Sequence, residues 1–185
     1  YLKKVEGRAR TGRPIRPRLV SGRTHRLTSL EEYRDEGHLR TDYRDVEDWG
    51  GVHVEFEDGT VADVYASEVV MGGVHNWLEV NANNHRARIN INPNDALTTY
   101  NPRGEQLDDV YIVEKIGTKE GWAPTSPDED WFTGYQHEMQ EFYSNFVAEA
   151  LPESDSLLGA DTIATVYAAY VSASNDGAAT EVPLV

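Results

Sequence analysis

The sequence predicts an α+β fold in which a predominantly antiparallel, open sheet has helices packed on one face. Two observations carry this prediction. Between residues 50 and 92, short segments alternate apolar and polar side chains and are separated by brief turns, which is typical of antiparallel strands. After residue 125, apolar residues recur every three or four positions, as on one face of a helix. The length of 185 residues fits one domain, predicted to span 1–185.

The clearest strand signal lies at 52–56, where apolar and polar residues alternate strictly. Asp58-Gly59 follows, a pair that favours a type I′ hairpin turn, and 61–65 continues as the second strand of the hairpin. Further strands are expected at 19–27, 77–81, 88–92, 110–116 and 180–185. Pro183 places the last of these at a sheet edge, because proline cannot donate to a strand ladder.

The N-terminal segment is expected to contain little regular structure. Residues 1–6 resemble the last turns of a helix that Gly7 ends. Residues 7–18 are rich in arginine, and Pro14 and Pro17 favour an extended connector. The segment 1–18 is therefore predicted to be a helix tail followed by a basic connector.

Two helices are predicted near the C-terminus. Ser126-Pro127-Asp128-Glu129 forms a capping box with proline at the first helical position. The apolar face of the helix that follows consists of Tyr135, Met139, Phe142, Phe146 and Ala150. A second helix is expected at 156–174, with small residues that allow close packing at Ala160, Ala164 and Ala168.

Charge is unevenly distributed along the chain, whose formal net charge is −15. The first 26 residues hold nine of the 17 basic residues and only one of the 32 acidic residues. Such a segment is either a nucleic-acid or phosphate patch, or a basic strap that lies on the acidic domain or on a missing neighbour. The absence of interleaved aromatic residues favours the strap, and the acidic remainder disfavours nucleic acid as a partner.

The composition excludes several classes of site. The chain has no cysteine, which excludes disulfides, thiolate metal sites and cysteine nucleophiles. It has no long apolar run, so no membrane partner is expected, and the default location is cytoplasmic. Its histidines show no metal-ligand spacing, and no glycine-rich phosphate loop opens a helix. No metal ligand and no catalytic residue is therefore assigned.

Two clusters remain as candidates for a binding site. His75, Asn76 and Trp77 follow the paired glycines 72–73, and they are interpreted either as a cleft mouth or as a β-bulge with ordinary surface residues. Lys119 and Trp122 lie before the capping box. Indole stacks on a sugar ring and an ammonium group donates to its hydroxyls, although Trp122 could instead cover the core.

The order of these elements resembles a known family. The segments 54–62, 78–80, 138–146 and 168–174 carry the resemblance, which extends over about residues 46–185. In order and spacing they are similar to the C-terminal domain of the Gfo/Idh/MocA oxidoreductases, the family of glucose–fructose oxidoreductase and inositol dehydrogenase.

The resemblance implies a C-terminal substrate-binding and oligomerisation domain of an NAD(P)-dependent enzyme acting on a sugar, cyclitol or related polyol. NAD or NADP would be bound mainly by an N-terminal Rossmann domain that this sequence lacks, so the chain is expected to be inactive alone. The loop 72–77 would face the substrate, and the open sheet face would form a homo-oligomer. The alternatives are a stand-alone binding or dimerisation module and a fragment of a redox-neutral, NAD-dependent glycosidase.

Overall fold

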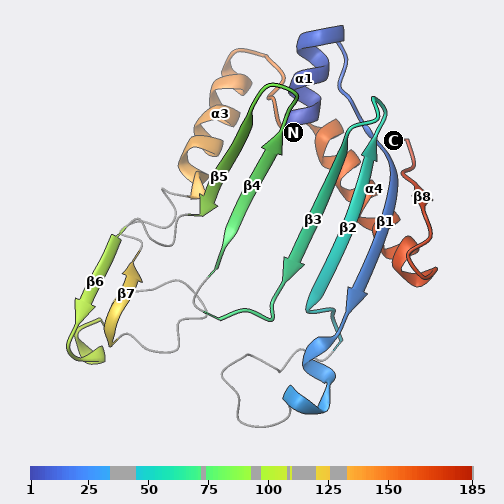
Figure 1. The fold of residues 1–185 in the computed structure, drawn as a ribbon. Coiled ribbons are helices and arrows are strands. Elements are labelled where there is room, and N and C mark those ends of the chain that lie inside the picture. Colours follow the sequence, from blue (N-terminus) through green and yellow to red (C-terminus); the bar gives the residue numbers. More distant parts are fainter. Residues whose placement is uncertain are drawn as a thin grey trace. The chain divides into compact units, whose positions relative to one another are not determined.

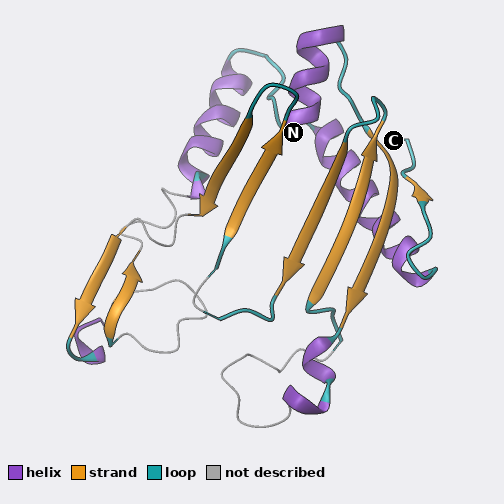
Figure 2. Cartoon of the chain, viewed as in Figure 1, coloured by secondary structure: helices purple, strands orange, loops and turns teal. Residues whose placement is uncertain are grey.

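The computed structural model describes residues 1–33, 45–71, 74–92, 97–107, 109, 120–125 and 133–184. The chain divides into two compact units, drawn as ribbons in Figures 1 and 2. Unit 1 comprises Tyr1–Val69 and Asn145–Val185, and unit 2 comprises Val70–Ser144. Both units contain antiparallel strand pairs together with helical residues, so the predicted α+β class is confirmed.

Unit 1 is built on a four-stranded sheet with the order β3-β2-β1-β8. Its strands are β1 (Pro17–His25), β2 (Trp49–Phe56), β3 (Val61–Ser67) and β8 (Thr180–Glu181). The pairs β1–β2, β2–β3 and β1–β8 are all antiparallel. The strands expected at 19–27, 52–56 and 61–65 are confirmed, and β8 lies at the edge where Pro183 placed it.

The turn between β2 and β3 differs from the predicted type I′ turn. Gly59 has a φ of 82°, whereas Asp58 is not among the residues with positive φ. The amide of Gly59 donates to the carbonyl of Phe56 at 2.9 Å, and Phe56 pairs with Thr60. This is a three-residue hairpin loop with one left-handed position. Asp58 instead accepts hydrogen bonds from Thr60 Oγ1 at 2.7 Å and from the Thr60 amide at 3.1 Å.

One helix, α4 (Ser156–Ser174), packs on β1 and closes the core of unit 1. Its first residue follows Asp155, whose carboxylate accepts a hydrogen bond from the amide of Leu158 at 3.0 Å. The buried core consists of Val20, Val54, Ala164, Ala168 and Val182. The expected helix at 156–174 is confirmed, and its alanines allow the close packing that their size predicted.

The N-terminal helix α1 spans Leu2–Thr11, so the prediction that Gly7 ends it is wrong. A Cβ added at Gly7 would lie 2.5 Å from the carbonyl oxygen of Arg13 and from the amide nitrogen of Ile15. Gly7 is thus a point of close approach between the helix and the chain that leaves it. The helix ends at Gly12, which has a φ of 77°.

The basic N-terminal segment neutralises acidic side chains of the same unit, which confirms the strap interpretation. Lys3 pairs with Asp58 at 2.8 Å, and Lys4 pairs with Asp155 at 2.8 Å. Further pairs join Arg8 to Asp155, Arg16 to Asp161, Arg18 to Glu55 and Arg23 to Asp176. The strap therefore links α1 and β1 to the β2–β3 hairpin and to α4.

A buried carboxylate organises the turn after β1. Asp48 accepts hydrogen bonds from the amides of Leu27 and Thr28, at 2.7 and 2.8 Å, and from the Thr28 hydroxyl at 2.5 Å. These residues belong to a short 3₁₀ helix, η1 (Leu27–Ser29), which η2 (Glu31–Tyr33) follows. Burial by itself would raise the pKa of Asp48, but the hydrogen bonds from Thr28 and Leu27 outweigh it and lower the pKa.

Unit 2 contains two separate strand pairs. The hairpin β4 (Asn76–Asn81) and β5 (Arg86–Asn92) confirms the strands expected at 77–81 and 88–92. The second pair, β6 (Leu97–Asn101) and β7 (Gly121–Thr125), was not predicted, and η3 (Gly104–Leu107) follows β6. The predicted strand 110–116 and the capping box lie outside the described residues. Among those described, the strands form three sheets rather than one.

The boundary between the units falls inside α3 (Tyr135–Val147). The presence of α3 confirms a helix in the region of the predicted apolar face. Within the described part of the chain, no helix is both long and apolar enough to cross a membrane.

Candidate functional site

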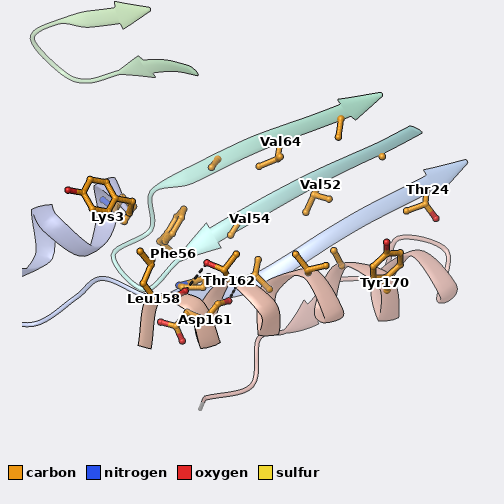
Figure 3. Close-up of a pocket in the computed structure, with 18 of the residues that line it drawn as sticks. Lys3, Thr24, Val52, Val54, Phe56, Val64, Leu158, Asp161, Thr162 and Tyr170 are labelled. Atoms are coloured by element: carbon orange, nitrogen blue, oxygen red, sulfur yellow. Dashed lines mark hydrogen bonds between the residues drawn. The ribbon is translucent and has the colours of Figure 1, made fainter. Parts of the chain in front are cut away.

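An apolar groove with a volume of about 630 Å³ lies between the sheet of unit 1 and α4. Figure 3 shows Val52, Val54, Phe56 and Val64 on its sheet side. Leu158, Asp161, Thr162 and Tyr170 line it from α4. The groove arises because Val52 and Val54 of β2 and Val64 of β3 point to the face of the sheet on which α4 packs, while α4 lies mainly against β1.

Polar side chains along this groove are engaged with one another. Arg16 Nε donates to both carboxylate oxygens of Asp161, at 3.1 and 2.9 Å, and this pairing raises the pKa of Arg16. The Tyr170 hydroxyl donates to Glu47, and that hydrogen bond raises the pKa of Tyr170. Tyr170 therefore stays protonated at neutral pH. What the groove offers a ligand is mainly apolar contact, and these paired groups are not arranged as a free acid and base.

The predicted cluster at the start of β4 is exposed. His75 precedes the strand, Asn76 begins it opposite Asn92, and Trp77 follows with 57% of its surface exposed. The guanidinium carbon of Arg88 lies 5.2 Å from the centre of the Trp77 ring. This cation–π contact occupies one face of the indole and ties β4 to β5.

Of the other two predicted residues, Lys119 lies outside the described residues. Trp122 lies on β7, is 73% exposed, and packs its ring against Tyr100 of β6, with centroids 5.4 Å apart and planes at 62°. Trp122 therefore does not plug a core, which was the competing interpretation. Of the described predicted residues, the structure places Asn76 and Trp77 on the β4–β5 sheet and Trp122 on the β6–β7 sheet, so it does not bring them together in one sheet.

Sequence reasoning missed Tyr100, which is directly opposite Trp122 in the β6–β7 register. A signal was present, because Leu97-Thr98-Thr99-Tyr100 is rich in residues that favour strands. No group of three or more potential metal ligands is found among the described residues.

Comparison with known proteins gives likenesses of fold. No family model matches the sequence, and no curated protein matches it. The crystal structure of GenD2 from gentamicin A biosynthesis, in complex with NAD, superposes with a TM-score of 0.68 at 22% identity. The match covers 91% of this chain and 42% of the GenD2 chain.

Two further solved structures show the same relation. Myo-inositol 2-dehydrogenase from Lactobacillus plantarum has a TM-score of 0.61 at 22% identity, with 95% of this chain covering 44% of that protein. A probable dehydrogenase from Thermotoga maritima has a TM-score of 0.58 at 17% identity, with coverage of 95% and 45%. The chain thus spans less than half the length of each.

At 17–22% identity these structures show that the chain shares its fold with part of each dehydrogenase. The expectation drawn from the order of the sequence segments is confirmed at the level of fold.

Proposed function

We propose that this chain is the substrate-side domain of an NAD(P)-dependent oxidoreductase acting on a sugar, cyclitol or related polyol. The observation that carries the proposal is the likeness of almost the whole chain to under half of each dehydrogenase structure. One of those structures contains NAD, and another is a myo-inositol 2-dehydrogenase. The remaining part of such a protein would hold the nucleotide.

The residues of this chain do not fit a dinucleotide. The sequence has no glycine-rich loop that opens a helix, which is the feature that cradles a pyrophosphate. A bound nicotinamide would supply the hydride acceptor, and NAD or NADP would be held mainly by the N-terminal Rossmann domain. The role left to this domain is to bind and orient the substrate, and we expect no redox activity from it alone.

The substrate contacts in this proposal are His75, Asn76, Trp77, Lys119 and Trp122. The described members of this set are exposed and lie at or near the start of β4 and on β7. Imidazole and amide groups exchange hydrogen bonds with hydroxyls, and indole offers an apolar ring face. Such a mixture suits a ring with hydroxyls at its rim and C–H groups on its faces.

The test is steady-state kinetics of His75→Ala in the full-length enzyme, with a polyol substrate and NAD or NADP. Loss of a substrate hydrogen bond is expected to raise KM by about fivefold to tenfold, while kcat changes less. His85→Ala is the matched control, since His85 is an exposed histidine at the turn between β4 and β5. Equal kinetics for the two variants would remove the 75–77 segment from the site.

Product analysis separates the remaining alternatives. A ketone product with stoichiometric NAD(P)H supports the dehydrogenase, whereas release of a sugar without net reduction indicates a redox-neutral glycosidase. A coding sequence without a glycine-rich strand–turn–helix upstream of residue 1 would instead support the stand-alone binding or dimerisation module.

A further inference from the structure

Two aromatic side chains stand opposite each other on the β6–β7 ribbon. Tyr100 and Trp122 are direct cross-strand partners, so their side chains leave the ribbon on the same face. Their ring centroids are 5.4 Å apart with an edge-type geometry, and they are 60% and 73% exposed. Aromatic side chains of this size are normally covered to a greater extent, so this pair presents an unusual apolar surface to solvent.

The geometry leaves ring surface available for a ligand. An edge-to-face contact uses one face of only one of the two rings, and the planes at 62° form an angled corner rather than a flat wall. The π face carries partial negative charge and attracts C–H groups that carry partial positive charge. The Tyr100 hydroxyl and the Trp122 indole N–H add hydrogen-bonding groups at the margins of the apolar corner.

A polar neighbour extends this surface along β6. Thr98 lies two residues before Tyr100, so its side chain is on the same face of the strand, and it is exposed. Asn101 lies on the other face, where its amide donates to Thr99 Oγ1 at 3.2 Å. The face of Tyr100 and Trp122 therefore combines apolar rings with hydroxyl and N–H groups.

Trp77 provides a contrast within the same unit. Arg88 lies over its ring at 5.2 Å, so one face of that indole is already covered by a cation. Trp122 has an aromatic neighbour at an angle instead. Of the two predicted tryptophans, Trp122 has the surroundings that a stacked ring requires.

We propose that Tyr100 and Trp122 form a stacking subsite for one six-membered polyol ring, a pyranose or a cyclitol. The assignment rests on the proposed function for the substrate class, and it adds Tyr100, which sequence reasoning missed. A ring of this kind matches an aromatic pair in size, with C–H groups against the rings and hydroxyls toward Thr98 and the indole N–H. A stable protein partner would instead cover about 1,200 Å² or more in total, far beyond two side chains.

The experiment is a titration of the 185-residue chain, labelled with ¹⁵N, followed through its indole N–H resonances. The four tryptophans give four such signals, which single Trp→Phe variants assign. The probes are myo-inositol and D-glucose, and glycerol is the control polyol that lacks a ring. We expect the Trp122 signal to shift saturably with the two ring probes and to stay in place with glycerol.

Variants separate stacking from a structural role. Tyr100→Ala is expected to weaken binding by about threefold to tenfold, the effect of losing one aromatic contact. Tyr100→Phe keeps the ring and is expected to stay within about twofold of the parent chain. Tyr143→Ala is the matched control, because it truncates a similarly exposed tyrosine on α3 outside the proposed contacts, and it should bind as the parent does. Unchanged amide spectra outside β6 and β7 would show that the variants remain folded.

Three outcomes overturn the subsite: no saturable shift of Trp122, an equal shift with glycerol, or undiminished binding by folded Tyr100→Ala. A change from dimer to monomer in sedimentation of Tyr100→Ala would also overturn it, because the pair would then belong to a protein interface. Failure of the proposed function is a separate result. Ring binding without nucleotide-dependent turnover of the full-length protein would refute the oxidoreductase and leave the subsite intact.

Discussion

Gly7 shows how a single residue carries information that its type does not reveal. Glycine in a basic, proline-containing segment predicted the end of a helix, yet the helix continues for another turn. Because Gly7 has no side chain, the segment that follows α1 can pack closely against the helix. A Cβ built at Gly7 would lie 2.5 Å from the Arg13 carbonyl oxygen and from the Ile15 amide nitrogen. A sequence shows the glycine, but only the tertiary structure shows which neighbour needs the space.

Gly7→Ala is therefore expected to destabilise unit 1, although alanine favours helices. The new methyl group would overlap backbone atoms that cannot rotate away, which costs about 2 kcal/mol or more. Gly159→Ala is the matched control within α4, since a Cβ there meets nothing within 4 Å. This control should stabilise the chain by up to about 1 kcal/mol. The measurement is the urea midpoint of unfolding for each variant. Equal midpoints for the two variants would contradict the close approach at Gly7.

In the candidate site, too, the sequence did not show which distant residues are in contact. Trp122 was predicted from its chemistry, while Tyr100 was not, because the two residues are 22 positions apart in the chain and meet only through the β6–β7 register. His75, Asn76 and Trp77 were predicted as neighbours in sequence, and their exposure is observed. Whether they touch substrate remains the prediction that the kinetic comparison with His85→Ala tests.

Among the elements, those with local signals were predicted best. Strict alternation at 52–56 and an Asp-Gly turn located the β2–β3 hairpin, although not the type of its turn. The helix α4 matched its predicted range because small and apolar residues recur along its length. The β6–β7 pair had no local turn to indicate it, since nearly 20 residues separate Asn101 from Gly121. Non-local pairing of short strands leaves little trace in sequence.

One ion pair connects α1 to the β2–β3 hairpin and makes this contact dependent on pH. Lys3 lies 2.8 Å from Asp58, and with Thr60 it lowers the pKa of Asp58 from 3.8 to about 2. A carboxylate with a lower pKa in the folded chain stabilises the fold above its unfolded pKa. That stabilisation is lost as the pH falls through the folded value, here between about pH 4 and pH 2.

Asp58→Asn is expected to lower the melting temperature at pH 7 by about 3 °C, which corresponds to about 1 kcal/mol for a partly screened pair. Asparagine is accepted in such turns, so the change removes mainly the charge. The difference from the parent should shrink as the pH approaches 2, where Asp58 becomes protonated. Asp45→Asn makes the same chemical change at an exposed position and should leave the melting curve in place. A difference that persists unchanged at pH 2 would contradict the assignment to the carboxylate charge.

For the molecule as a whole, the fold class and its family likeness were predicted from sequence, because the order of several weak segments is more specific than any one of them. The proposed homo-oligomer needs a surface, and the sheet of unit 1 offers one on the face opposite α4. On that face Trp49 lies over Gly51, and its ring contacts Tyr65 at a centroid distance of 5.8 Å. Trp49 is half-buried and Tyr65 is 66% exposed, and exposed aromatic residues are enriched in protein interfaces.

If this face forms the oligomer, Tyr65→Lys should convert the chain to a monomer, because a buried ammonium group without a partner is costly. Sedimentation velocity measures the change directly. Asn84→Lys adds the same charge at the exposed turn between β4 and β5 and should leave the mass unaltered. A parent chain that sediments at 20.8 kDa over the micromolar range would argue against this interface.

The pairing of β1 with β8 joins segments that lie far apart in the chain, so the ribosome makes them at different times. Val20 is made before Val182, with which it shares the core, and about 160 residues lie between the two. The intervening residues, unit 2 among them, are complete before this core can close. Until α4 and Val182 are made, Val20 and Val54 lack part of their core, and exposed apolar surface of this kind favours aggregation.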